Sequence, residues 1–257
     1  MKTFAAHNCY GVAAITALTV QNTQGAMRQT PAEPKMLEES LAMLFADGRI
    51  RAVKIGMLAN RANVEIVAKA LDGHGDIPVV LDPVIRSASG LDLLDARGLE
   101  ALRSDLLKRT TIVTPNLAEA AALTGLKVDS VEMMKLAAQK MIELGAKAVV
   151  VTGGHLEKAV DVFSDGATTE TFAADHVKPD NTHGTGCAYS SAVAANLALG
   201  RHLHDAVMLA KVYVTEAIRK AYSVGPGRMP LNHFFRSQQA PRAADLSPAP
   251  SEAEPAH

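Results

Sequence analysis

Short apolar runs alternate with helical segments along most of this 257-residue chain, and this alternation constrains the fold more than any other feature. The runs are rich in Val, Ile and Leu with few polar interruptions, as expected of strands that are buried on both faces. The segments between them carry apolar residues at the spacing of one helix face, as Met36, Leu37, Leu41 and Phe45 do. We therefore expect an α/β fold with a mostly parallel central sheet and helices on both of its faces.

The predicted elements follow this alternation. Strands are expected at residues 12–19, 52–57, 78–81, 111–114 and 146–151, and a hairpin at 160–163 and 169–172. Helices are expected at residues 33–46, 63–71, 96–107, 117–123, 130–144, 188–199 and 204–222. Residues 1–236 form one domain in this interpretation. Residues 237–257, rich in Pro, Ala and Ser, are expected to form a flexible tail.

The composition argues against several classes of function. Lysine and arginine number 26 against 27 acidic residues, a net charge of −1, so no basic surface for nucleic acid or anionic membranes is expected. No apolar run reaches the length of a membrane span. Cys9 and Cys187 form neither a disulfide framework nor a zinc-binding spacing, which favours a reducing, cytoplasmic location.

The polar stretch at residues 181–190 is the strongest candidate for a ligand site, because it is a glycine-containing loop that leads directly into a helix. A helix N-terminus presents unpaired N–H groups that attract anions, and Gly184 and Gly186 would let a ligand approach the backbone. Cys187, just inside the helix, would have a lowered pKa and could act as a base or nucleophile. The alternative interpretation is a glycine turn before an ordinary core helix, with Cys187 a small buried residue.

Polar residues also follow the predicted strands, at Gln21, Asp82, Asn116 and Thr152, and Met57 stands beside Gly56 at another strand end. In such sheets ligands bind beyond the carboxyl ends of the strands, so these positions and the loop–helix stretch are expected to converge on one active site. We refer below to these positions as the strand-end residues.

Phosphoryl transfer would need an anion cradle, a divalent cation site and a base, and this chain has candidates for all three. The cradle is residues 184–187, and Cys187 is the best-placed base. Asn116 and Glu119 are three residues apart at a strand-to-helix junction, and Asp82 is a further oxygen donor for a cation. The alternatives are a helix N-cap for Asn116 and a solvated helix face for Glu119.

Several motifs resemble those of the hydroxymethylpyrimidine/phosphomethylpyrimidine kinases of thiamine biosynthesis, in the ribokinase superfamily. The motifs lie at residues 11–23, 54–58, 82–84, 114–120, 153–156, 183–187 and 230–235. Cysteine at position 187 is typical of the pyrimidine kinases, whereas ribokinases generally carry an aspartate there. The resemblance implies a ribokinase-like fold, ATP as co-substrate, Mg²⁺ as cofactor, a small pyrimidine as substrate and a homodimeric assembly.

The resemblance also implies roles on the substrate side. Gln21 would bind the aminopyrimidine, since a side-chain amide offers a donor and an acceptor together. Met57 and Val84 would pack against the ring. The alternatives are a turn residue that closes a strand for Gln21, and plain core positions for Met57 and Val84.

On the phosphate side, the resemblance implies that Asn116 and Glu119 organise Mg²⁺ and the phosphates, with Asp82 as a further metal ligand. Gly184, Thr185 and Gly186 would donate to the transferring phosphoryl group, where donors that are already in position matter most. Cys187 would take the proton from the substrate hydroxymethyl group. The residues named for this side of the site are Asp82, Asn116, Glu119, Thr152, Gly184, Thr185, Gly186 and Cys187.

The chain departs from the family pattern at two places. Relatives begin with a strand, a Gly-Ser-Asp turn and a helix that leads into Lys-Thr-Phe, which here stands at residues 2–4. We therefore expect the kinase domain to lack the first strand and a substrate-side aspartate. Many relatives carry a phosphate-contacting lysine where this chain has Thr152, which supplies a hydroxyl but no charge.

The expected activity is ATP-dependent phosphorylation of 4-amino-5-hydroxymethyl-2-methylpyrimidine and of its monophosphate. One alternative is a pyridoxal kinase, because related folds phosphorylate similar hydroxymethyl heterocycles. Another is a non-catalytic pyrimidine-binding protein, since the expected loss of the first strand and the aspartate could remove turnover. A third is a chain that does not fold stably alone.

Overall fold

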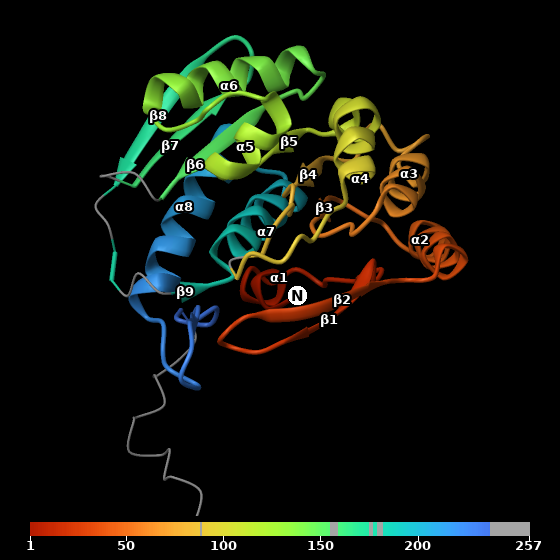
Figure 1. Ribbon diagram of the computed structural model, residues 1–257, viewed down its shortest axis with the longest axis horizontal. Coiled ribbons are helices and arrows are strands. Elements are labelled where there is room, and N and C mark those ends of the chain that lie inside the picture. The colour runs from red at the N-terminus through yellow and green to blue at the C-terminus, as the bar shows by residue number, and fades with distance from the viewer. Residues whose placement is uncertain (88, 155–158, 175–176, 179–181, 237–257) are drawn as a thin grey trace, which may run out of the picture.

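A central sheet of six strands, in the order β3-β4-β5-β6-β7-β8, organises the fold (Figure 1). The computed structural model describes residues 1–87, 89–154, 159–174, 177–178 and 182–236, so the expected tail at 237–257 lies outside the described residues. The first four strands are parallel to one another: β3 (Val53–Ile55), β4 (Val79–Leu81), β5 (Ile112–Val113) and β6 (Val149–Gly153). The last two, β7 (Ala159–Ser164) and β8 (Thr169–Ala174), are antiparallel and form the predicted hairpin.

Helices cover both faces of this sheet, which confirms the expected architecture (Figure 1). One face packs against α2 (Pro34–Asp47), α3 (Arg61–Ala70), α4 (Ala96–Ala101), α5 (Leu117–Thr124) and α6 (Val131–Glu143). A π-helical turn at Leu102–Leu106 and a 3-10 turn at Leu107–Arg109 continue α4. The other face packs against α1 (Lys2–Ala6), α7 (Thr185–Ala198) and α8 (Leu203–Arg219).

The period-2 geometry of the strands divides the core into two clusters. Leu81, Val113 and Val151 point to the cluster under α3–α6, whereas Val80 and Val150 point to the cluster under α7 and α8. All five side chains have no exposed surface. Because both faces are buried, these strands read as continuous apolar runs, and the sequence could therefore identify them.

The strand expected at residues 12–19 is wrong in position and in environment. The structure has β1 at Ala17–Gln21, which pairs only with β2 (Ala26–Pro31) in a separate antiparallel hairpin. Leu18 is 67 % exposed, so this is not a buried strand. The turn explains the difference, because the Asn22 side chain accepts hydrogen bonds from the N–H groups of Gln24 and Gly25 and reverses the chain.

A third, short sheet joins segments that lie far apart in the sequence. β9 (Thr182–His183) pairs in parallel with β10 (Met229–Pro230), and neither strand was expected. β9 leads into α7, whose first helical residue is Thr185 rather than the predicted Ala188. This pairing places the C-terminal segment beside the loop–helix stretch.

Candidate active site

Three of the strand-end residues, Asp82, Asn116 and Thr152, converge at the carboxyl edge of the parallel strands, whereas Gln21 ends a strand of a separate sheet. Backbone hydrogen bonds connect successive strand ends, with Asp82 donating to Ile55, Thr114 to Leu81, and Thr152 to Pro115. Asn116 and Thr152 form an isolated β-bridge just beyond β5 and β6. The expected gathering of Asp82, Asn116 and Thr152 at one edge is therefore present, with α7 beginning beside them.

The N-terminus of α7 has the form of an anion cradle. Gly184 precedes the helix with φ +83°, a conformation that favours glycine, and none of the described side chains caps the helix. The first intrahelical bond runs from the Ala188 N–H to the Gly184 carbonyl, so the N–H groups before it have no helical partner. A Cβ added at Gly184 or Gly186 would meet nothing within 4 Å. The space beside these two glycines is therefore open, and an uncapped helix N-terminus of this kind suits a phosphate group.

A buried charged cluster lies beneath this cradle. Lys54, the middle residue of β3, places its Nζ 3.3 Å from Asp82 Oδ2, and the two side chains are 13 % and 6 % exposed. The Ser190 hydroxyl donates to the same carboxylate oxygen at 3.1 Å. Burial, the largest single cause, lowers the pKa of the Lys54 ammonium, but the nearby Asp82, Cys187 and Glu119 together outweigh it and leave that pKa raised. Lys54 and Ser190 therefore hold the Asp82 carboxylate in one position.

Asn116 and Glu119 form a reciprocal capping box at the start of α5. The Glu119 N–H donates to Asn116 Oδ1 at 3.0 Å, and the Asn116 N–H donates to Glu119 Oε2 at 2.9 Å. The alternative of an N-cap thus describes Asn116, whereas the solvated face suggested for Glu119 is wrong, because Glu119 is buried. Burial, followed by the nearby Asp82 carboxylate, raises the pKa of Glu119 to about 8.

Cys187 corrects one expectation. The sequence suggested a lowered pKa for this thiol, but the Asp82 carboxylate and burial of the group raise its pKa to about 12. The thiol also hydrogen-bonds to Asp82, which stabilises the protonated form. The Cys187 residue as a whole is exposed while its thiol is directed at Asp82, so the alternative of a small core residue is wrong too. The prediction failed because it considered the helix N-terminus without the buried carboxylate beside it.

The remaining substrate-side residues lie in loops next to this cluster. Met57 and Val84, which follow β3 and β4, are half-buried rather than plain core. Their backbones are fixed: the Thr16 hydroxyl donates to the Met57 carbonyl at 2.6 Å, and the Val84 N–H donates to the Asp82 carbonyl at 2.8 Å. Thr152, which belongs to the phosphate side and lies within β6, is half-buried, with its hydroxyl 3.4 Å from the Pro115 carbonyl oxygen.

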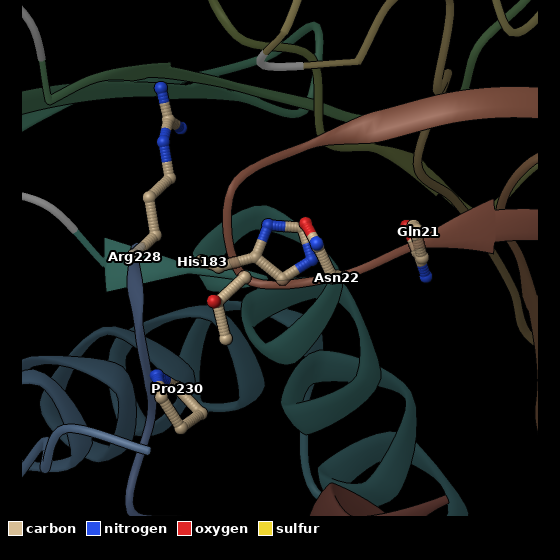
Figure 2. Close-up of a pocket in the computed structure, with 6 residues that line it drawn as sticks. Gln21, Asn22, His183, Arg228 and Pro230 are labelled. Carbon is tan, nitrogen blue, oxygen red and sulfur yellow. The ribbon is translucent and has the colours of Figure 1, made fainter. Parts of the chain in front are cut away.

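Gln21 lies in a separate cavity of about 290 Å³ between the hairpin and β9–β10 (Figure 2). Gln21 is the last residue of β1, which agrees with the alternative interpretation of Gln21 as a turn residue that closes a strand. The cavity is lined by Gln21, Asn22, Thr23, His183, Arg228 and Pro230. Figure 2 shows that the Arg228 side chain extends away from the His183 ring. The Arg228 N–H donates to the Thr23 carbonyl at 2.8 Å, which ties the hairpin turn to the C-terminal segment.

The sequence analysis assigned no role to Lys54, Ser190, His183 or Arg228. Lys54 carried a recognisable signal, because it is a charged residue inside an otherwise apolar run that forms a buried strand. Arg228 carried none, since the short β9–β10 pairing that places it at the cavity has no periodicity to detect.

A metal centre made by protein side chains alone is not visible in the described ranges. Within residues 1–87, 89–154, 159–174, 177–178 and 182–236, no group of three or more His, Cys, Asp or Glu side chains could hold a metal ion. Among the same residues, no helix is both long enough and apolar enough to cross a membrane.

The sheet, the open helix N-terminus and the carboxylates at the strand ends define a ribokinase-like α/β kinase. The family model described as phosphomethylpyrimidine kinase matches residues 1–232, and the chain belongs to this family. A hydroxymethylpyrimidine/phosphomethylpyrimidine kinase of Aquifex aeolicus is 42 % identical over 229 residues, which cover 88 % of this chain and 90 % of the relative.

Two solved structures are similar over most of their length. The phosphomethylpyrimidine kinase of Clostridium difficile 630 has a TM-score of 0.75 and 36 % identity, covering 84 % of this chain and 90 % of its own. The pyridoxal kinase of Bacillus subtilis, solved as an ADP complex, has a TM-score of 0.82 and is 34 % identical. The match covers 90 % of this chain and 89 % of the pyridoxal kinase chain. The fold is thus shared by kinases named for two different acceptors.

Proposed function

We propose that this protein transfers the γ-phosphoryl group of ATP to 4-amino-5-hydroxymethyl-2-methylpyrimidine and then to the resulting monophosphate, in thiamine biosynthesis. The observation that carries the proposal is the position of the Cys187 thiol, between an open helix N-terminus and the buried Asp82 carboxylate. Membership of the phosphomethylpyrimidine kinase family supports the choice of acceptor.

The cradle residues would hold the phosphoryl group during transfer. The backbone N–H groups at Thr185 and Gly186 are free to donate to its oxygen atoms, and the space beside Gly184 and Gly186 admits it. Asn116 and Thr152 would contact the phosphates of ATP from the neighbouring strand ends, with a hydroxyl at Thr152 in place of the lysine common in relatives.

The residues present fit a magnesium ion. Asp82 and Glu119 lie close enough for the Asp82 charge to help raise the pKa of Glu119, and a divalent cation between them would relieve this repulsion. Their oxygen atoms, completed by water and phosphate, would hold Mg²⁺, which needs only one or two carboxylates from the protein. When bound, Mg²⁺ would neutralise phosphate charge and offset the carboxylate field that raises the pKa of Cys187.

In its thiolate form, Cys187 would accept the proton of the hydroxymethyl group as the oxygen of that group bonds to the γ-phosphorus. The bond from this phosphorus to the bridging oxygen breaks, and ADP leaves. The Ser190 hydroxyl, which contacts both the Cys187 carbonyl at 3.2 Å and Asp82, fixes the first turn of α7 against the carboxylate. This network would keep the thiol directed at the acceptor.

The pyrimidine would lie between the hairpin and the loops that follow β3 and β4. The Gln21 amide would pair with the ring nitrogen and the amino group, and Met57 and Val84 would contact the ring faces. Gln21 is exposed at the edge of the cavity, which leaves its amide free for a ligand.

We also propose a homodimer in the cytoplasm. The exposed apolar side chains of the hairpin support an assembly through this region, because Leu18 and Met27 are 67 % and 77 % exposed. Light scattering after size exclusion would measure the assembly directly, and a monomer at micromolar concentration would contradict it.

The test of function is ADP release from Mg·ATP with three acceptors: hydroxymethylpyrimidine, its monophosphate and pyridoxal. We expect turnover of both pyrimidines at rates well above that of pyridoxal. Turnover of pyridoxal alone would replace the proposed acceptor, and the similarity to a pyridoxal kinase structure makes this the relevant rival. Tight pyrimidine binding without ADP release would instead favour a binding protein.

A further inference from the structure

Lys54 is a cation within the reaction centre whose purpose the first phosphorylation does not explain. Its ammonium contacts Asp82, and among the described side chains it is the cationic group that contacts the Asp82–Ser190–Cys187 network. The ammonium also lies close to the backbone at Gly56, where an added Cβ would be 2.5 Å from Lys54 Nζ.

The Lys54 ammonium is a fixed positive charge beside this network. It lies 3.3 Å from Asp82 Oδ2, and the Ser190 hydroxyl donates to the same oxygen. The α-amino group of Met1 is a second positive group near the cluster, where burial and then Lys54 lower its pKa. Met1 is 59 % exposed, however, so water screens its charge more strongly than that of Lys54.

The two acceptors of the proposed function differ mainly in charge. Hydroxymethylpyrimidine presents a neutral hydroxyl, whereas its monophosphate brings a charge of about −1.5 to −2 into the same place. In the second transfer an ionised phosphate oxygen bonds to the γ-phosphorus, while the bond from that phosphorus to the bridging oxygen of ATP breaks and ADP leaves. No proton has to be removed, so this step needs compensating positive charge more than a base.

We propose that Lys54 determines specificity for the phosphorylated acceptor, by compensating the charge that the monophosphate adds beside Cys187. This inference rests on the proposed function and adds to it a residue that separates the second phosphorylation from the first. Because ATP and the cation are common to both transfers, their contributions cancel when the two acceptors are compared on the same variant.

The test compares kcat/KM for the two acceptors in Lys54→Gln, whose amide can still donate to Asp82. We expect kcat/KM for the monophosphate to fall about 100-fold more than kcat/KM for hydroxymethylpyrimidine, the scale of one partly screened charge interaction. Lys54→Arg, which keeps the charge, should hold the ratio of the two values within about threefold of wild type. Equal losses with both acceptors, or no loss, would overturn the proposal.

Lys211→Gln is the matched control. Lys211 forms the other buried ion pair, 2.7 Å from Asp161 on β7, and three strands separate β7 from β3 in the sheet. This variant should leave the acceptor ratio unchanged. If it shifts the ratio as Lys54→Gln does, the effect comes from loss of a buried ion pair in general, and the proposal fails. A wild-type chain that phosphorylates neither pyrimidine would overturn the proposed function itself, and this inference with it.

A second measurement does not depend on the stability of Lys54→Gln. In wild-type protein with ¹³C-labelled lysine side chains, the monophosphate should shift the Lys54 Cε resonance, and the unphosphorylated pyrimidine should not. Lys54→Arg provides the assignment. Binding of the monophosphate without any shift at Lys54 would overturn the proposal.

Discussion

The buried cluster at the ends of β3 and β4 and the cavity behind the hairpin form two contrasting halves of the site. In the cluster, Lys54, Asp82 and Ser190 are packed, hydrogen-bonded and nearly shielded from water. In the cavity, Gln21 and Arg228 are exposed, and Arg228 has no ion-pair partner among the described residues. The difference teaches that the proposed reacting groups are fixed by the core, whereas the proposed recognition of the acceptor depends on surface segments that the core does not hold.

The largest expected effect concerns the reactivity of Cys187. With a pKa near 12, its thiol should react with iodoacetamide at pH 8.5 about a thousandfold more slowly than a free thiol, despite its exposure. Asp82→Asn should recover much of this rate, because the Asp82 carboxylate is the largest cause of the raised pKa. Mass spectrometry of the Cys187 peptide measures both rates. Fast alkylation of the wild type would show that the cluster does not control the thiol.

The next effect concerns stability. The pKa of Glu119 is about 8 in the folded protein against 4.5 for an unperturbed carboxyl, so the folded state binds the extra proton between these values. Stability should therefore fall as pH rises through this window, by about 2 kcal/mol between pH 6 and 8.5. Urea unfolding in EDTA measures the change.

Glu119→Gln sharpens this second prediction. Glutamine keeps the hydrogen bond of the capping box but cannot ionise, so most of the pH dependence should disappear. Glu65→Gln, which removes a surface carboxylate on α3, is the control and should leave the dependence of unfolding free energy on pH unchanged. If the unfolding free energy of Glu119→Gln changed with pH as that of wild type does, the pH dependence would belong to other groups.

The smallest expected effect is a change in KM for hydroxymethylpyrimidine when the Gln21 cavity is altered. Gln21→Leu should raise KM for hydroxymethylpyrimidine about tenfold, the cost of one lost hydrogen-bonding partner, and leave KM for ATP unchanged. Its melting temperature should match that of wild type, since Gln21 lies outside the central sheet. Gln24→Leu changes a residue of the same turn that does not line the cavity, and should alter neither constant. A large fall in the stability of Gln21→Leu would show that the cavity, like the buried cluster, is part of the stable core, and would contradict the contrast between the two halves.

The same contrast explains what the sequence could and could not predict. Strands such as β4 and β6 are buried on both faces, so their apolar runs revealed the sheet and placed Asp82, Asn116 and Thr152 at one edge. The hairpin was misplaced because β1 has one exposed face and its partner β2 has almost no apolar pattern.

The raised pKa of Cys187 could not be predicted for a different reason. It depends on Asp82, a residue distant in sequence, and only the packing of α7 on the sheet brings the two together. Position within a helix is local information, whereas the field at a buried thiol is set by tertiary contacts.

The bond between Thr23 and Arg228 has a consequence for the order in which the molecule forms. A Cβ at Gly227 would lie 2.2 Å from the Thr23 carbonyl oxygen, so the early hairpin turn and this late segment interlock without room for a side chain. During synthesis, the parallel strands can assemble well before residue 227 is made. The Gln21 cavity cannot form so early, because Arg228 and Pro230 in its wall are translated late. An unfinished chain would thus possess the proposed reacting groups before the proposed site of acceptor selection.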